Sequence, residues 1–281
     1  MKNSSLKKVV YANYDWDDNI IFMPTRIVFF SKKTNLPQEI EVSTELFAHV
    51  RSKVGTESCK LFLHHDQNVE IASEQVSGRQ IDLIDYEVRN DDATGSFRQF
   101  RDCSRNYFLN DLEKALHANS FGPSFKDFVE HCSTPELANN VTIITARGHA
   151  PETLHKGLVR LQQLGLIKCV PPVENMYPCS YKGLKAVAVA SAQNPSDAKK
   201  NILMSILDKI QHNSNNDNSD SVHSFGFSDD DSKTMKLVSE TLNNELQKQR
   251  WSGFEINLYF TGNKTKQRQV LLVKEKVEEV A

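Results

Sequence analysis

Two groups of aspartates follow hydrophobic segments of this 281-residue chain, where they could act together. Asp15 and Asp17 come directly after the segment 8–14, and an unbroken acidic run, 229–231, comes shortly after the segment 222–227. In an open parallel sheet, ligands bind where the strands end at their carboxyl edge. Because carboxylate oxygens are the ligands that Mg²⁺ prefers, the two groups together predict a magnesium site.

Hydrogen-bond donors that could bind an anion follow another hydrophobic segment and open a later helix. Thr145 ends the segment 141–145, and the backbone N–H groups of the next turn follow it. Two adjacent lysines lie near the start of a predicted helix, 196–210. Such donors can bind phosphate oxygens, as can the positive end of a helix that starts near Pro151. The candidates for phosphate binding are Thr145, Ala146, Arg147 and Lys199, with Lys200 as the alternative lysine.

Phosphoryl transfer is the chemistry that this set of side chains suits. A carboxylate can attack phosphorus without a base to activate it. Because the nucleophile and the phosphate are both anions, a divalent cation is needed between them, and Mg²⁺ suits oxygen ligands. Asp15 is the candidate nucleophile. Asp17 could protonate the leaving oxygen and later deprotonate the attacking water.

Each of these groups also has an ordinary structural explanation. An Asp-x-Asp sequence after a strand is common in turns and caps, and a threonine at a strand end often bonds within its own turn. The run 229–231 could cap a helix that begins near Ser232, and the lysines could be surface charges. We favour a shared site because the groups occur in one order and each follows the expected kind of element.

Predicted strands and helices alternate from residue 140 onward. The strand predictions rest on short apolar runs, and the helix predictions on stripes such as Leu154, Leu158 and Leu161. Alternation of this kind is typical of a parallel sheet with helices on both faces. The polar segment 212–221 is predicted to be a surface loop. The strands are 8–14, 141–145, 184–190, 222–227 and 254–260, and the later helices run from Pro151 to near Gly165, over 196–210 and over 232–250.

Residues 22–135 separate the first two hydrophobic segments and have a mixed character. Extended runs and predicted helices occur in the same stretch, without the regular alternation that follows residue 140. This stretch therefore predicts an inserted α/β subdomain. The extended runs are 27–30, 60–63 and 81–88, and the predicted helices are 44–53, 104–117 and 125–132.

The motifs resemble those of the haloacid dehalogenase-like (HAD) superfamily of aspartate-nucleophile phosphatases. The sequence Asp-Trp-Asp-Asp-Asn at 15–19 stands where that superfamily has a strand followed by Asp-x-Asp-x-Thr. The segment 141–145 resembles its second motif, a strand that ends in Thr or Ser. Lys199 is preferred for the third motif, a lysine near a helix start. The segment 225–230 resembles the fourth motif, a strand that ends in an acidic pair.

The resemblance implies a fold, a reaction and a set of roles. Residues 1–21 and 136–281 would form a Rossmann-like catalytic core, and residues 22–135 would form a cap that selects the substrate. The chain would be a Mg²⁺-dependent phosphomonoester hydrolase that passes through an aspartyl-phosphate. A phosphotransferase on the same scaffold and a non-catalytic binding protein are the alternatives. The nucleophile would be Asp15, the acid/base would be Asp17, and Mg²⁺ would bind to the Asp15 carboxylate, the Asp17 carbonyl, Asp229 and Asp230.

Two positions depart from the superfamily pattern. Asn19 replaces the usual threonine of the first motif, a change that should preserve a hydrogen bond. Lys233 lies where many relatives carry another acid, so the fourth-motif ligands rest on the acidic run alone. Neither departure removes the nucleophile.

The composition of the chain limits the classes of partner that are expected. The formal net charge of −2 gives no overall field that would recruit DNA or an anionic membrane, and no apolar run is long enough to cross a bilayer. Five scattered cysteines predict reduced thiols in a cytoplasmic protein. The expected substrate is a small phosphomonoester, although a phosphate end of a nucleic acid is also compatible with the motifs. The sequence leaves the oligomeric state open.

Overall fold

The computed structural model describes residues 7–63, 69–71, 79–91, 94–103, 105–184, 191–216, 221–251, 253–262 and 267–272. The chain forms two compact units. One contains residues 1–23 and 115–281, and the other contains residues 24–114.

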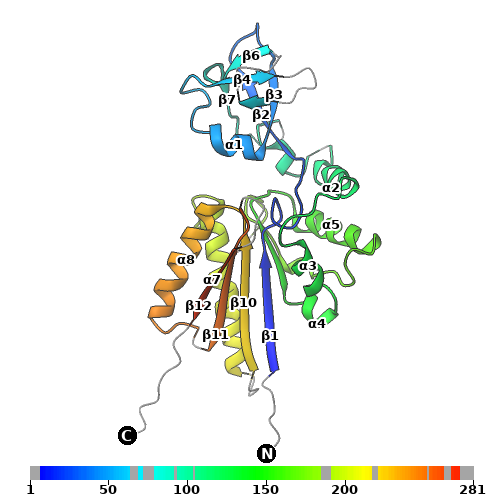
Figure 1. The fold of residues 1–281 in the computed structure, drawn as a ribbon, viewed down its shortest axis with the longest axis vertical. Coiled ribbons are helices and arrows are strands. Elements are labelled where there is room, and N and C mark those ends of the chain that lie inside the picture. The colour runs from blue at the N-terminus through cyan, green and yellow to red at the C-terminus, as the bar shows by residue number, and fades with distance from the viewer. Residues whose placement is uncertain are drawn as a thin grey trace, which may run out of the picture. The chain divides into compact units, whose positions relative to one another are not determined.

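A sheet with five parallel strands forms the core of the first unit, which has an α/β fold consistent with a Rossmann-like architecture (Figure 1). Its strands are β1 (Lys7–Tyr14), β8 (Val141–Thr145), β9 (Met176–Pro178), β10 (Ser221–Asp229), β11 (Phe254–Phe260) and β12 (Gln267–Leu272). Their order is β12-β11-β10-β1-β8-β9, and β12 runs antiparallel to β11 at one edge. The first strand therefore lies in the interior of the sheet, between β10 and β8.

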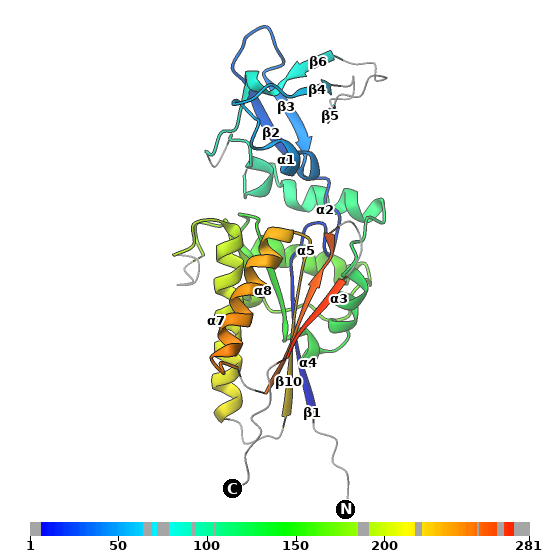
Figure 2. The same cartoon turned by 60° about the vertical axis from the view of Figure 1, so that its left-hand side comes forward.

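Helices cover both faces of this sheet. Tyr11 packs against the hydrophobic cluster formed with α7 (Pro195–Asn216) and α8 (Ser232–Gln247). Tyr14 lies three residues later and points to the opposite face, where its ring meets Phe128 of α3 (Phe125–His131) edge-on at 5.7 Å. Figure 2 shows α7 and α8 on one side of the strands and α3 on the other. The other helical elements of this unit are α4 (Pro135–Ala138), α5 (Pro151–Gln163) and the 3₁₀ turn η3 (Val173–Asn175).

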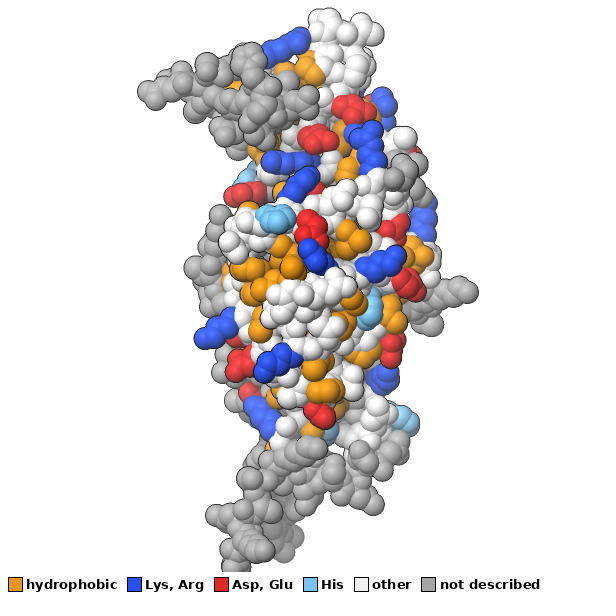
Figure 3. Space-filling model, turned by 90° about the vertical axis from the view of Figure 1, so that its right-hand side faces the viewer, with side chains coloured by type: hydrophobic (Ala, Val, Ile, Leu, Met, Phe, Trp, Pro, Cys, Tyr) orange, Lys and Arg blue, Asp and Glu red, His pale blue; other side chains and the backbone are white. Residues whose placement is uncertain are grey.

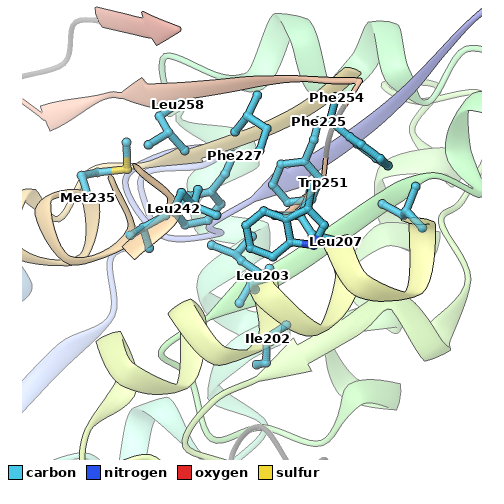
Figure 4. Close-up of a cluster of buried hydrophobic side chains, with 14 of the residues drawn as sticks. Ile202, Leu203, Leu207, Phe225, Phe227, Met235, Leu242, Trp251, Phe254 and Leu258 are labelled. Carbon is cyan, nitrogen blue, oxygen red and sulfur yellow. The ribbon is translucent and has the colours of Figure 1, made fainter. Parts of the chain in front are cut away.

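Large apolar side chains join α7 and α8 to the sheet (Figure 4). Leu203 and Leu207 of α7 are fully buried and lie four residues apart, so they form one stripe on the helix. They pack with Phe225 and Phe227, which alternate along β10 and therefore share one face of that strand. This packing fixes α7 against the sheet and so fixes the position of the lysines in its first turns.

The second unit, residues 24–114, contains two antiparallel sheets of three strands, ordered β3-β2-β7 and β5-β4-β6. A common core joins them, with Phe29 from one sheet and Leu61 from the other, both fully buried. The strands are β2 (Arg26–Ser31), β3 (Glu39–Ser43), β4 (Lys60–Leu63), β5 (Val69–Ile71), β6 (Arg79–Asp82) and β7 (Tyr86–Glu87). The helical elements are α1 (Thr44–Val50), η1 (Leu83–Asp85) and η2 (Arg98–Phe100), and α2 (Tyr107–His117) crosses the boundary to the first unit.

The boundaries of the second unit differ from the segment 22–135 that the sequence suggests. The two helices α3 and α4 belong to the first unit with the sheet. The physical reason is visible at Tyr14, whose hydroxyl lies 2.6 Å from Nδ1 of His131 on α3. A short amphipathic helix that covers the first strand cannot be separated by its sequence from the helices that precede it.

Two local predictions differ from the structure, and a third falls almost wholly outside the described residues. The composition of the segment 212–221 predicts a loop, but α7 continues to Asn216 because no glycine or proline interrupts it. Residues 217–220 lie outside the described part of the chain. Of the predicted strand 184–190, residues 185–190 are likewise outside it. The place beside β8 is taken by β9, a three-residue strand with no visible periodicity. The predicted strand 81–88 is divided by η1 into β6 and β7.

Among the helices that the structure describes, none combines the length and the hydropathy that a bilayer crossing requires.

Truncation of Leu203 tests the packing of α7 on the sheet. Leu203→Ala should lower the free energy of unfolding by about 2–5 kcal/mol, because it removes buried methyl groups and leaves a cavity. Leu164→Ala is the matched control, since Leu164 is 45% exposed and its loss should change stability by less than about 0.5 kcal/mol. Chemical denaturation of both variants measures the difference. Equal effects would contradict the described core.

Candidate active site

The carboxyl ends of β1 and β10 bring Asp15 and Asp229 together. Tyr14 pairs with Ser228 in the parallel ladder, so an aspartate follows the paired residue on each strand. The Asp15 N–H continues the ladder by donating to the Ser228 carbonyl at 2.9 Å. Both aspartates are buried, and one carboxylate oxygen from each lies within 4.8 Å of the other and of an oxygen of Asp230.

Lys199 supplies the positive charge that these carboxylates contact. Its Nζ donates to Oδ2 of Asp229 at 2.7 Å and lies 3.1 Å from Oδ1 of Asp15. The lysine lies in the second turn of α7, which begins after Asn194, whose Oδ1 accepts the N–H of Asp197 at 3.0 Å. A side-chain acceptor at this position caps a helix. The cap and the buried stripe of α7 together hold the ammonium group at the strand ends.

Negative charge exceeds positive charge in this cluster. Asp15, Asp229 and Asp230 contribute three carboxylates, and Lys199 contributes one ammonium group. Burial raises the pKa of Asp15 well above its ordinary value, and the carboxylates of Asp229 and Asp230 raise it further, while Lys199 opposes them. Burial and the Asp229 charge raise the pKa of Asp230 to about 7. The protein thus holds acidic groups where ionisation is costly.

A hard divalent cation fits this donor set. Three carboxylate oxygens lie close enough together to share one ion, and all are of the hard type that Mg²⁺ prefers. Oδ1 of Asp15 is buried and accepts no hydrogen bond from the described residues, beyond its ion pair with Lys199. A cation beside it would offset the remaining negative charge. The residues present therefore suit Mg²⁺.

Asn19 joins the turn after β1 to the ends of two other strands. Its Nδ2 donates to the carbonyl of Asp15 at 3.0 Å and to the hydroxyl of Ser228 at 2.9 Å, and its Oδ1 accepts from the hydroxyl of Thr261 at 3.0 Å. The backbone N–H of Thr261 in turn donates to the carbonyl of Asp229. The amide of asparagine donates from its nitrogen and accepts at its oxygen, whereas a threonine hydroxyl must do both at one atom that lies closer to the backbone. Asn19 therefore fixes the backbone of both Asp15 and Asp229.

Ser228 and Thr261 are site residues that the motifs did not indicate. Ser228 lies one position before Asp229, and Thr261 follows the last residue of β11. Both are buried polar residues at the carboxyl edge of the sheet. A polar residue directly after the predicted strand 254–260 was the available signal for Thr261.

Arg147 lies in the turn after β8 and contacts Asp17. Its Nε and Nη2 donate to the two carboxylate oxygens of Asp17 at 2.8 and 2.6 Å, so the pair is bidentate. The arginine side chain is fully buried, whereas that of Asp17 is 19% exposed. Asp17 is not one of the three carboxylates that lie close together. The structure thus joins two residues that the sequence placed in different roles.

The remaining candidates lie at the same edge but differ in exposure. Thr145 is fully buried at the end of β8, and its Oγ1 accepts the N–H of Arg147 at 3.3 Å. Ala146 is exposed in the turn. Lys200 is partly exposed and lies 3.7 Å from Asp197, so it does not reach the carboxylates that Lys199 contacts. Asp231 caps α8 by accepting the N–H of Lys233.

Compared with known proteins, the chain matches no family model, no curated protein and no solved structure.

Substitution of Asp230 tests the cost of the clustered charges. The pKa of about 7 lies above the ordinary value of 3.8, so between these values the folded protein binds a proton that the unfolded chain does not. The free energy of unfolding should therefore fall as pH rises from about 4 to about 7. Asp230→Asn removes the contribution of Asp230 to this dependence, while that of Asp15 remains, and should raise the melting temperature of the metal-free protein at pH 8 by roughly 2–4 °C for each kcal/mol recovered.

Calorimetry between pH 5 and 8 with a chelator present measures this slope. The exposed Asp102 provides the control, since Asp102→Asn should leave the slope unchanged. A slope in Asp230→Asn equal to that of the wild type would show that Asp230 ionises without a penalty.

Proposed function

We propose that this chain is a Mg²⁺-dependent phosphomonoester hydrolase that forms an aspartyl-phosphate on Asp15, on a scaffold of the HAD-like type. The observation that carries the proposal is the convergence of Asp15, Lys199, Asp229 and Asp230 at the ends of adjacent parallel strands. Asp15 is far from the other three residues in the sequence, and together they form a largely buried cluster of carboxylates around one ammonium group. Phosphoryl transfer to a carboxylate needs this combination.

In the first step, a carboxylate oxygen of Asp15 attacks the substrate phosphorus. A new P–O bond forms to Asp15 as the bond to the leaving oxygen breaks, and the leaving oxygen takes a proton from Asp17. Thr145, the N–H of the following turn and Lys199 would donate hydrogen bonds to the other phosphate oxygens. Their positions at the carboxyl ends of β8 and beside Asp15 support this role.

In the second step, water attacks the phosphorus of the aspartyl-phosphate. Asp17 takes the proton of the water, the P–O bond to Asp15 breaks, and inorganic phosphate leaves with the oxygen of water. Asp15 is then a free carboxylate again and Asp17 is protonated again, as they were before the first step. Asn19 holds the backbone of Asp15 in place for both steps, because its Nδ2 donates to the Asp15 carbonyl and to the Ser228 hydroxyl.

Mg²⁺ would be held by Asp15, Asp229 and Asp230, with the Asp17 carbonyl as a further oxygen by the HAD resemblance. When bound, the ion offsets the repulsion between the nucleophile and the phosphate and polarises the phosphoryl oxygens.

The unit of residues 24–114 takes the role of the inserted cap in this proposal, because it stands between the first and second motifs of the chain. A small phosphomonoester is the substrate class that we infer. On the face shown in Figure 3, acidic and basic side chains are interspersed with apolar ones, and this mixture does not resemble a nucleic-acid-binding surface. All five cysteines are free thiols, which suits the cytoplasm.

Removal of the nucleophile tests the proposal directly. Asp15→Asn should lower the hydrolysis of p-nitrophenyl phosphate by at least about 10⁴-fold, because an amide oxygen cannot form the covalent intermediate. The protein should remain folded by circular dichroism. Asp102→Asn, at an exposed aspartate, should keep wild-type activity. Activity that survives in Asp15→Asn would refute the assigned nucleophile, and a wild type without Mg²⁺-dependent turnover would favour a binding protein.

The identity of the final acceptor separates hydrolysis from transfer to an alcohol. With p-nitrophenyl phosphate and 1 M glycerol (about one-fiftieth of the molarity of water), a hydrolase should release phosphate and p-nitrophenolate in nearly equal amounts. A phosphotransferase would release less phosphate than p-nitrophenolate and would form glycerol phosphate. Phosphorus NMR of the products measures the partition, with Asp15→Asn as the blank.

A further inference from the structure

We infer that Arg147 is a positioning residue for Asp17 and not a ligand of the substrate phosphate. This inference rests on the proposed function, because it concerns how the acid/base of that reaction is held. It replaces the phosphate-binding role that the sequence suggested for Arg147. The argument starts from the two hydrogen bonds between the side chains.

Arg147 is held both at its guanidinium group and at its backbone. Its Nε and Nη2 bond to the two oxygens of Asp17 at 2.8 and 2.6 Å. The backbone of Arg147 is held by the Thr145 hydroxyl, which accepts its N–H at 3.3 Å, and by the Ser180 N–H, which donates to its carbonyl at 3.1 Å. The side chain is 0% exposed, so packing restricts its rotamers as well. Arg147 thus presents a rigid fork to the loop after β1.

Asp17 depends on this fork for its orientation. Arg147 provides the hydrogen bonds that the structure gives for the Asp17 carboxylate, and 19% of that side chain is exposed. Without the fork, a short exposed side chain on a loop would sample several rotamers. A group that must meet first a leaving oxygen and then a water molecule needs a fixed position, and misplacement by about 1 Å can cost about 100-fold in rate.

Two of the five guanidinium N–H groups, one on Nε and one on Nη2, are committed to the carboxylate of Asp17. Arg147 would have to break both bonds to Asp17 before those same N–H groups could reach a phosphate. Lys199 already lies beside Asp15, and Thr145 lies at the end of the adjoining strand, so phosphate donors are present without Arg147. The bidentate geometry also explains why arginine, with its planar fork, occupies this position where a lysine would offer a single point charge.

Leaving groups of different basicity distinguish the two roles. p-Nitrophenolate leaves without help from an acid, whereas an alkoxide must be protonated as it leaves. In rapid-quench experiments with Mg²⁺, Arg147→Met should slow formation of the aspartyl-phosphate from ethyl phosphate by about 10²–10⁴-fold. It should slow formation from p-nitrophenyl phosphate by less than about tenfold, and KM should change little for either substrate.

Three further variants sharpen the test. Asp17→Asn should show the same dependence on the leaving group, and the double variant Asp17→Asn/Arg147→Met should lose no more than Asp17→Asn alone, because the two residues act as one unit. Arg147→Lys keeps the charge without the fork and should resemble Arg147→Met. Arg160→Met, at a half-buried arginine in the last turn of α5, should match the wild type.

Equal slowing of aspartyl-phosphate formation for both substrates, together with a raised KM, would overturn the inference and make Arg147 a phosphate ligand. If Arg147→Met does not fold, Arg147→Lys carries the same comparison with the charge retained. Failure of the proposed function looks different, because the wild type would then form no aspartyl-phosphate from p-nitrophenyl phosphate.

Discussion

The ammonium group of Lys199 between Asp15 and Asp229 is the interaction on which the rest of this site depends. Carboxylates that are removed from water repel one another, and without an internal cation their burial would favour protonation or unfolding. The lysine offsets part of this negative charge, and the negative charge that remains is of the kind that a divalent cation can neutralise. The sheet places the carboxylates at neighbouring strand ends, and α7 places the ammonium group of Lys199 beside them from its second turn.

The larger features of the fold follow from patterns that can be recognised in a single sequence. The strands β1, β8, β10 and β11 each contain short apolar stretches, and the alternation of strands with helices after residue 140 predicts their parallel arrangement. Elements with weak local patterns were harder to predict. β9 is three residues long and contains a proline, so its pairing with β8 depends on tertiary contacts. The end of α7 at Asn216 lies in a polar stretch whose composition resembles a loop, although nothing in it breaks a helix.

The candidate site shows a similar division. Strand ends predict where Asp15 and Asp229 lie, because parallel strands end at one edge of a sheet. Which lysine faces them depends on the phase of α7, and the stripe of Leu203 and Leu207 could have indicated it. The pairing of Arg147 with Asp17 could not be predicted in this way. Both residues follow strands at the same edge of the sheet. Only the side-chain geometry shows whether such an arginine binds a carboxylate of the protein or is directed towards an anionic ligand.

The cluster joins residues that are far apart in the chain, with more than 200 positions between Asp15 and Asp230. No shorter stretch of polypeptide holds all the oxygens, so during synthesis on the ribosome the carboxylate cluster is completed only after β10 has emerged and taken its place beside β1. Until then Asp15 lacks the neighbouring carboxylates of Asp229 and Asp230, although Lys199 has already been synthesised. Formation of the carboxylate cluster therefore requires that the central strands β1 and β10 have already paired.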